Sequence, residues 1–363
     1  MSCPGVTEVT LSGANTLPDS CTASTSKGAS MKTSAHSRFV LAALALLLIT
    51  GLAGASGQPE EGDLREVTVV LDWLPNTNHA GLYLALERGW FQDEGLDVEI
   101  VQPSELGSDQ LVASGRGEFG VSHQEAVTFA RTADEALPIV AIGTILQHNT
   151  SGYAVPADRD VEDPGDFVGL RYGGWGTAYE DAMLNAVMSP FNADAGDVTT
   201  VNVGTTDIFA AFRREIDMTW IFYGWDGVRA EIEGVELDYF PLVDLDERLD
   251  YYTPLFIARE ELLREEPGLA RAFMRAVSRG YQTAAADPAT AAALLREYAP
   301  EIDARLAEES LIYLSDYFLD DSGSFGTMDP AVWEAFTGFM NEQDLLPNPM
   351  EVEAAFSNEY LPQ

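Results

Sequence analysis

Short apolar runs alternate with amphipathic stretches through the chain from residue 66 onward. Four runs have the length and composition of buried strands: VTVVLDW, LDVEIV, FGVS and LPIVAIGTI. Between them, residues 78–89, 107–117 and 124–132 show helical spacing. Strands that alternate with helices predict a parallel sheet covered by helices on both faces.

A second alternating unit begins after TSGYAVPADRDVEDPGDF. Its predicted strands are GLRYGG, VTTVNV, DMTWIFY and LDYFPLV, and its predicted helices are 178–188, 206–214 and 226–233. One more strand, YYTPLFIARE, precedes a helical remainder. We expect those last helices at 259–265, 267–286, 288–298, 303–317 and 329–341.

This order predicts an α/β protein of two doubly wound lobes. The chain would cross between them near residues 150–157 and 252–258, and the C-terminal helices would complete the first lobe. We therefore expect a leader and signal peptide at 1–55, a first lobe of 66–152 plus 256–363, and a second lobe of 153–255.

The stretch that starts at Met31, MKTSAHSRFVLAALALLLITGLAGASGQ, has the three parts of a secretory signal. Lys32 and Arg38 supply a positive region, an apolar run follows, and Ala-Gly-Ala at 53–55 offers a cleavage site. The apolar run is short for a membrane span, so a retained anchor is the weaker alternative. Ala55 stands where a lipoprotein would carry its lipid-bearing cysteine, which argues against a lipid anchor. We expect an exported protein.

The charge of the chain excludes some partners. It has 20 basic and 59 acidic residues, a formal net charge of −39. Such a surface repels nucleic acid and anionic membranes. Both lysines, Lys27 and Lys32, and both cysteines, Cys3 and Cys21, precede residue 55. The remainder therefore forms no disulfide, and it has no lysine for the Schiff base that pyridoxal phosphate requires.

Polar and aromatic residues gather where the predicted strands end. In open α/β sheets, ligands bind beyond the carboxyl ends of the strands. The ends concerned are 72–79, 122–125, 147–150, 172–177, 204–207 and 223–227. Together they predict a cleft lined by flat rings and neutral hydrogen-bonding groups.

Other interpretations of these residues stay open. Polar residues before helices also serve as caps, and buried tryptophans also serve as core. The capping interpretation applies to Asn76, Asn78, Thr206 and Asp207, and the core interpretation to Trp73 and Trp225. The histidines at strand ends, His79, His123 and His148, make a zinc site conceivable, although their spacing is not that of a known motif.

Several segments carry a family resemblance. LDWLPNTNHAGLYLALERGWFQDEGLDVEI resembles the opening of the thiamine-pyrimidine class of periplasmic solute-binding proteins of ABC transporters. GEFGVSHQEAVTFAR, TILQHNTSGYAV, YGGWGTAYEDAML and WIFYGWDGVRAE are similar to the same superfamily. The resemblance covers nearly all of residues 66–260. It implies a type II periplasmic-binding-protein fold, a monomer, and delivery of the ligand to an ABC permease.

The resemblance also limits the classes of ligand that we expect. Relatives bind formylaminopyrimidine or similar thiamine precursors, and another branch is linked to riboflavin. A third branch contains pyrimidine synthases that use pyridoxal phosphate and iron; this chain departs from them because its mature part lacks lysine and cysteine. We therefore expect a binding protein for a flat nitrogen heterocycle, without enzymatic activity, cofactor or metal.

The predicted ligand-binding residues follow from the strand ends and the resemblance. Rings would stack on the heterocycle, amides and imidazoles would bind its edge, and a carboxylate would pair with an aminopyrimidine through two hydrogen bonds. Asp226 is the first candidate for that carboxylate and Glu180 the second. The full set is Trp73, Asn76, Asn78, His79, His123, Gln124, Tyr172, Trp175, Glu180, Tyr223, Trp225 and Asp226.

Overall fold

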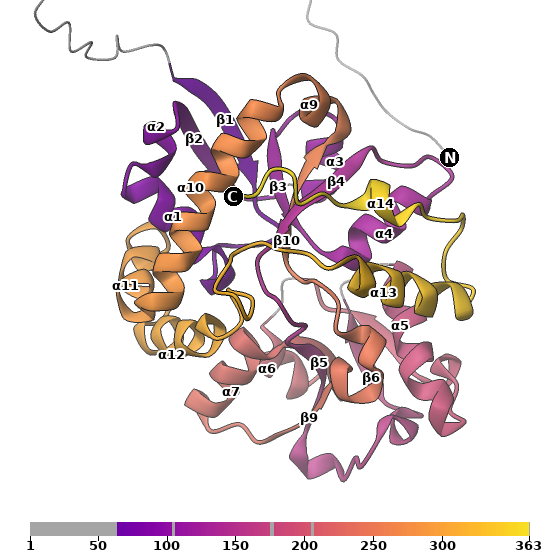
Figure 1. Cartoon of the computed structure of the whole chain (residues 1–363). Coiled ribbons are helices and arrows are strands. Elements are labelled where there is room, and N and C mark those ends of the chain that lie inside the picture. Colours follow the sequence, from indigo (N-terminus) through magenta and orange to yellow (C-terminus); the bar gives the residue numbers. More distant parts are fainter. Residues whose placement is uncertain (1–63, 104–105, 175–177, 205–206, 363) are drawn as a thin grey trace, which may run out of the picture. The chain divides into compact units, whose positions relative to one another are not determined.

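The computed structural model describes residues 64–103, 106–174, 178–204 and 207–362, which belong to one compact unit (Figure 1). The predicted leader with its signal at Met31, and the predicted site residue Trp175, lie outside these residues. Within the described ranges, every helix is too short or too polar to cross a lipid bilayer.

The first sheet has the strand order β2-β1-β3-β10-β4. Strands β1 and β2 are parallel, as are β1 and β3, whereas β10 runs antiparallel to both of its neighbours. The bounds are β1 Arg65–Val70, β2 Leu96–Val101, β3 Phe119–Ser122, β4 Ile139–Thr144 and β10 Leu255–Arg259.

The second sheet has the order β7-β6-β8-β5-β9. Strands β6, β7 and β8 are parallel, and β5 runs antiparallel to β8 and β9. The bounds are β5 Ser151–Pro156, β6 Arg171–Gly174, β7 Thr199–Asn202, β8 Met218–Phe222 and β9 Leu237–Pro241.

The predicted parallel arrangement is wrong for one strand in each sheet, β10 in the first and β5 in the second. Strands β5 and β10 each follow a passage of the chain from one sheet to the other, and each enters its new sheet in the reverse direction. The predicted crossings at 150–157 and 252–258 largely coincide with these two strands. The passages themselves are residues 145–150 and 242–254. The short run SGYAVP, with Gly and Pro near its ends, gave little sign of a strand.

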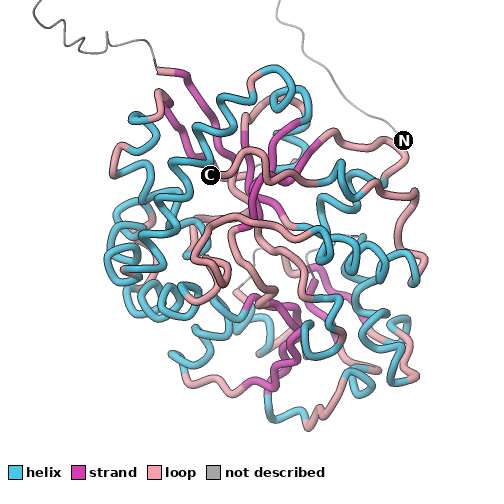
Figure 2. The backbone as a smooth tube through the Cα atoms, viewed as in Figure 1, coloured by secondary structure: helices cyan, strands magenta, loops and turns pink. Residues whose placement is uncertain are grey.

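Helices flank both sheets, as Figure 2 shows in cyan around the magenta strands. The four long C-terminal helices were predicted to within two residues at each end. Prolines occupy the first turn of α10, α11 and α13, whereas Pro300 lies before α12 and outside it. The bounds are α1 Ala80–Glu87, α2 Trp90–Asp93, α3 Gly107–Ala113, α4 Gln124–Thr132, α5 Ala178–Met188, α6 Ile208–Phe212, α7 Val228–Glu233, α8 Leu242–Leu245, α9 Glu260–Glu265, α10 Pro267–Ala286, α11 Pro288–Tyr298, α12 Ala304–Ser315, α13 Pro330–Glu342 and α14 Val352–Ala355.

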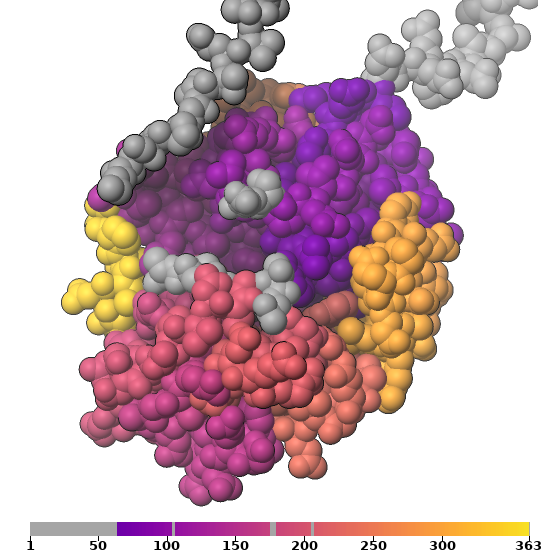
Figure 3. All heavy atoms as spheres, turned by 180° about the vertical axis from the view of Figure 1, so that it is seen from behind, coloured from indigo at the N-terminus to yellow at the C-terminus, as the bar shows by residue number. Residues whose placement is uncertain are grey.

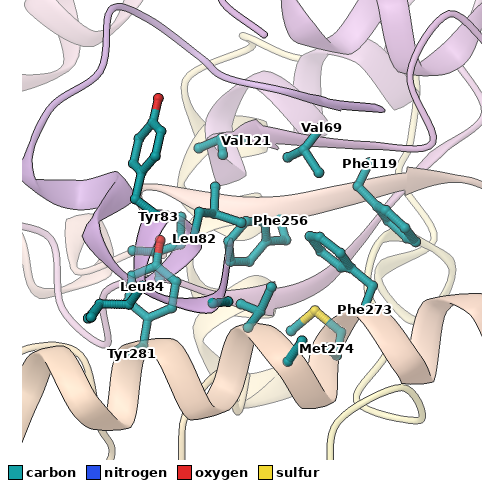
Figure 4. Close-up of a cluster of buried hydrophobic side chains, with 14 of the residues drawn as sticks. Val69, Leu82, Tyr83, Leu84, Phe119, Val121, Phe256, Phe273, Met274 and Tyr281 are labelled. Carbon is teal, nitrogen blue, oxygen red and sulfur yellow. The ribbon is translucent and has the colours of Figure 1, made fainter. Parts of the chain in front are cut away.

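One face of the first sheet is buried under α1, α10, α11 and α12. Leu82 and Leu84 of α1 pack there with strand residues (Figure 4). The rings of Phe119 on β3 and Phe273 on α10 lie 4.0 Å apart and nearly parallel. Burying side chains of this size contributes about 1.5–3 kcal/mol each. Helix α11 packs against α1, and Figure 3 shows the orange C-terminal helices beside the indigo N-terminal segment.

Helix α13 contributes to the cores of both sheets. Trp333 packs with Leu255 and Ile257 on the other face of the first sheet. Phe336 and Phe339 join the core of the second sheet, where the ring of Phe336 lies 4.4 Å from that of Tyr251. The C-terminal region therefore holds the two sheets together, and the lobe boundaries given above stay a prediction.

Candidate functional site

The turn after β1 holds His79 against Asp72. Nε2 of His79 lies 2.7 Å from Oδ1 of Asp72, and the backbone N–H of Asn76 donates to Nδ1 at 3.2 Å. Because Nδ1 accepts, the proton of the neutral ring is on Nε2, which donates to the carboxylate. Burial raises the pKa of Asp72, but its interaction with His79, with His123 nearby, outweighs burial and lowers that pKa. Asp72 is therefore a fixed negative charge at the end of β1.

The two asparagines of this turn have different roles. Asn76 accepts from the backbone N–H of Asn78 at 2.9 Å and caps the 3-10 helix Thr77–His79 (η1), so its capping interpretation is confirmed. The backbone carbonyl of Asn78 accepts from the hydroxyl of Tyr281 at 2.6 Å. Its side-chain Oδ1 is buried and has no hydrogen-bond partner among the described residues. Asn78 thus carries an acceptor that a ligand can use.

Trp73 stands beside these polar groups with an exposed fraction of 40%. The core interpretation of Trp73 is therefore wrong. An exposed indole at the carboxyl end of a buried strand is free to stack on a flat ring.

His123 connects the first sheet to the second. Its Nε2 lies 3.5 Å from the other carboxylate oxygen of Asp72, and its Nδ1 lies 3.0 Å from the hydroxyl of Thr253. Its ring is stacked 6.0 Å from that of Phe222, the last residue of β8. Sequence reasoning missed Phe222 and Thr253. Phe222 directly precedes the predicted site residue Tyr223, and that position was the one available signal.

Gln124 positions the chain where it passes between the sheets. Its backbone N–H donates to the carbonyl of Tyr252 at 3.0 Å, and its side-chain Oε1 accepts from the N–H of Tyr252 at 2.9 Å. The next residue, Glu125, was absent from the predicted set. It is only 2% exposed, and burial raises the pKa of its carboxyl to about 7.

A single π-helical turn, η6 (Tyr223–Gly227), follows β8, and α7 begins after it. The predicted start of helix 226–233 is therefore two residues too early, because α7 begins at Val228. Two close approaches require glycine here: a Cβ on Gly224 would lie 2.5 Å from Leu314, and one on Gly227 would lie 2.4 Å from the ring of Tyr223. Such π-turns are rare and occur often at functional sites.

The η6 turn carries three of the predicted residues. Trp225 is half-buried and packs against the core of the first sheet, so it reaches from one sheet to the other. The hydroxyl of Tyr223 donates to Glu231. Asp226 is half-buried, and burial raises the pKa of its carboxyl to about 7 although Arg229 acts in the opposite direction.

Tyr172 on β6 and Glu180 on α5 form a buried pair. The Tyr172 hydroxyl donates to Oε1 of Glu180 at 2.8 Å, and the exposed fractions are 0% and 2%. The Tyr172 ring packs in the hydrophobic core, so in this conformation its faces are not available for stacking. Trp175 lies outside the described residues.

The three histidines do not converge on one point. His79 and His123 share Asp72, whereas His148 lies 2.8 Å from Asp250. Across the described ranges, the His, Cys, Asp and Glu side chains form no group of three or more that could hold a metal ion.

Comparison with known proteins adds to this geometry. The family described as NMT1/THI5 like matches residues 76–291. The formylaminopyrimidine-binding protein of Halalkalibacterium halodurans is 31% identical over 324 residues, which cover 87% of this chain and 96% of that protein. The riboflavin-binding protein RibY of Chloroflexus aurantiacus is 24% identical, over 82% of this chain and 87% of that protein.

A solved structure has the same fold. The alkanesulfonate-binding protein SsuA from Xanthomonas axonopodis pv. citri, bound to MOPS, matches with a TM-score of 0.63. The match covers 82% of this chain and 99% of that one at 14% identity. The predicted periplasmic-binding-protein fold is thereby confirmed.

Proposed function

Because the chain belongs to the NMT1/THI5-like family, we propose that it is an extracytoplasmic solute-binding protein that captures a thiamine pyrimidine precursor of the formylaminopyrimidine type for an ABC importer. The observation that carries the proposal is the similarity to the formylaminopyrimidine-binding relative, which extends across nearly all of both chains. Export through the segment at Met31, a monomeric state and the two-lobe division belong to the same proposal.

The described residues supply the groups that such a ligand needs. An aminopyrimidine presents a ring nitrogen beside an amino group, and a carboxylate pairs with this edge through two hydrogen bonds when the ring nitrogen is protonated or in its imino form. Asp226, on a turn that touches the core of the first sheet, is the proposed partner. The exposed Trp73 offers a stacking face, and the free Oδ1 of Asn78 offers an acceptor.

The mechanism we propose is capture between the sheets. His123, held by Asp72 and Thr253, meets Phe222 from the second sheet, so a ligand bound here contacts both. Excluding water from such a site strengthens each polar contact with the ligand. No residue acts as a nucleophile in this scheme, because binding and release complete the task.

Isothermal titration calorimetry on the purified protein tests the proposal. We expect formylaminopyrimidine to bind, and Asp226→Asn to weaken binding by about tenfold or more, since a charge-assisted pair becomes a neutral one. Asp238→Asn, a carboxyl on β9 of the same sheet, is the matched control and should leave the affinity unchanged. If the wild-type protein leaves the pyrimidine unbound, the proposal is wrong.

Riboflavin is the second candidate ligand. The similarity to RibY and the aromatic residues at the strand ends favour it. Protein purified without added ligand would then be yellow, and riboflavin, not the pyrimidine, would raise its melting temperature. That result would retain the transport role and replace the ligand.

A further inference from the structure

Five buried polar atoms lie without a hydrogen-bond partner among the described residues where the two sheets meet. They are Nε2 of Gln124, Oε2 of Glu125, the hydroxyls of Tyr153 and Tyr251, and Nε1 of Trp220. Each of these residues is at most 2% exposed. We call this set the buried polar cluster.

The members of the buried polar cluster are neighbours. The rings of Tyr153 and Trp220 lie 5.8 Å apart. Burial first, and then the charge of nearby Glu125, raise the pKa of the Tyr251 hydroxyl, and Tyr153 adds to the effect. Gln124 precedes Glu125 on α4 and binds the backbone of Tyr252, next to Tyr251.

The buried polar cluster draws on both sheets. Phe129, one turn beyond Glu125 on α4, stacks 5.7 Å from Tyr179 on α5, and Tyr179 meets Trp220 edge-on at 6.3 Å. Helix α4 follows β3 of the first sheet, whereas α5 and Trp220 belong to the second.

The buried polar cluster also continues the candidate site. Trp220 and Phe222 are two residues apart on β8, so they lie on the same side of that strand. Phe222 meets His123, which stands two residues before Glu125. The polar groups therefore extend from the η6 turn, past Phe222 and His123, to Glu125.

Buried polar atoms in folded proteins nearly always have partners, so several orphans in one place indicate a bound polar group, which is either water or part of a ligand. The atoms here are complementary in kind: the carboxylate oxygen accepts, the indole and amide nitrogens donate, and the two phenols do either. An apolar group would satisfy none of them. A substituent that both donates and accepts would satisfy several at once.

We infer that the buried polar cluster is a second recognition point of the ligand, and that it binds an amide or hydroxyl substituent on the heterocycle. The substituent donates to Oε2 of Glu125 and accepts from Nε1 of Trp220. This inference rests on the proposed function, in which Asp226 binds the amino edge of the ring. The cluster then selects pyrimidines by the substituent that they carry next to that edge.

Calorimetric titration of two ligands tests the inference. One is formylaminopyrimidine, and the other is its analogue with a methyl group in place of the formylaminomethyl substituent. We expect Glu125→Gln and Trp220→Phe each to weaken binding of the first ligand about tenfold and to change binding of the analogue about threefold or less, because only the first ligand reaches the cluster. Ser278→Ala, which removes another buried, unpartnered hydroxyl on α10, is the control and should change neither affinity.

The possible outcomes separate the two proposals. If the wild-type protein binds neither ligand, the proposed function falls, and this inference falls with it. If wild type binds the pyrimidine and both variants bind it equally well, or lose affinity for both ligands alike, the substituent does not reach the cluster and the inference alone is wrong. Should Glu125→Gln fail to fold, Trp220→Phe carries the same comparison.

Discussion

The imidazole of His79 and the carboxylate of Asp72 lie 2.7 Å apart at the carboxyl end of β1, with His79 fully buried. His123 approaches the second carboxylate oxygen at 3.5 Å. Asp72 therefore orients two of the predicted site histidines, although the predicted set did not include it. The His at the end of DWLPNTNH has a structural partner as well as a place in the candidate site.

Asp72→Asn should lower the free energy of unfolding at neutral pH by about 1–3 kcal/mol, because His79 loses its charged acceptor. The folded pKa of Asp72 is below its ordinary value of 3.8, so the stabilisation is complete above about pH 3.8 and is lost as the pH falls toward the folded pKa. Urea unfolding of both proteins across this range measures the difference. A difference that stays constant into the most acidic samples would contradict the assignment.

The carboxyl of Glu125 should affect stability in the opposite direction from that of Asp72. Its folded pKa of about 7 lies above the ordinary 4.5, so the buried carboxyl lowers stability increasingly as the pH rises from about 4.5 to about 7 and by a constant amount above that. We expect apo Glu125→Gln to be more stable than wild type at about pH 8, by on the order of 3 kcal/mol, and to lose this advantage near pH 4.5. Thermal melts at both pH values test this. A less stable variant at the higher pH would show that the carboxylate has a structural partner.

Ligand binding near neutral pH should change the number of bound protons, in a direction that identifies the form of the bound pyrimidine. The carboxyl of Asp226 has a pKa of about 7 in the free protein, so roughly half of the molecules carry a proton there at pH 7. A pyrimidine that binds in its imino form brings no extra proton, favours the ionised carboxylate and lowers that pKa, whereas a ring nitrogen that becomes protonated on binding takes up one proton. Calorimetry in buffers of different ionisation enthalpy should therefore detect release of up to about half a proton per ligand for the imino form, and net uptake of up to about half a proton for the protonated ring. Either change should shrink in Asp226→Asn; an unchanged value would place the proton elsewhere.

Helices and strands were predictable where the sequence of a single segment is enough to indicate them. Helices α10 and α11 begin at Pro267 and Pro288 with long apolar stripes, and their predicted bounds agree with the structure. Strand β5 was missed because SGYAVP pairs only with strands far along the chain, β8 and β9. Its antiparallel direction depends on where the chain enters the second sheet, which local patterning does not record.

In the candidate site too, local sequence located some residues, whereas contacts between distant segments determine the others. Strand ends located His123 and Asp226, because the carboxyl end of a strand can be found in sequence. Phe222, Thr253 and Tyr251 matter because segments about 100–130 residues apart meet, as in the hydrogen bond of His123 to Thr253. The π-turn at 223–227 depends on contacts of Gly224 with α12, so its pattern resembled an ordinary helix start.

Added salt should stabilise the protein. Its formal net charge is −39, and repulsion among excess carboxylates opposes the compact state. Exposed pairs such as Arg275–Glu94 are also screened, but each such pair contributes only about 0–1 kcal/mol. We expect the melting temperature to rise from low salt to about 1 M NaCl, where the screening length is about 3 Å. KCl should act alike, and a steady fall in melting temperature with either salt would show that ion pairs dominate.

Ser310 on α12 should prove important for both stability and ligand binding. Its hydroxyl donates to the carbonyl of Gly224 in η6, and the hydroxyl of Thr77 lies 2.6 Å from Oγ of Ser310. Ser310 and Thr77 are fully buried, so Ser310→Ala leaves two buried groups without that partner. We expect a loss of about 1–3 kcal/mol in the free energy of unfolding.

The same substitution releases the turn that carries Trp225 and Asp226, so affinity for the pyrimidine should fall as well. Ser315→Ala is the matched control, because Ser315 on the same helix donates to the carbonyl of Ile312 within that helix. Urea unfolding and calorimetry on the two variants give both quantities. If Ser310→Ala lost stability but bound the pyrimidine as tightly as wild type, the hydroxyl would support packing without positioning the η6 turn.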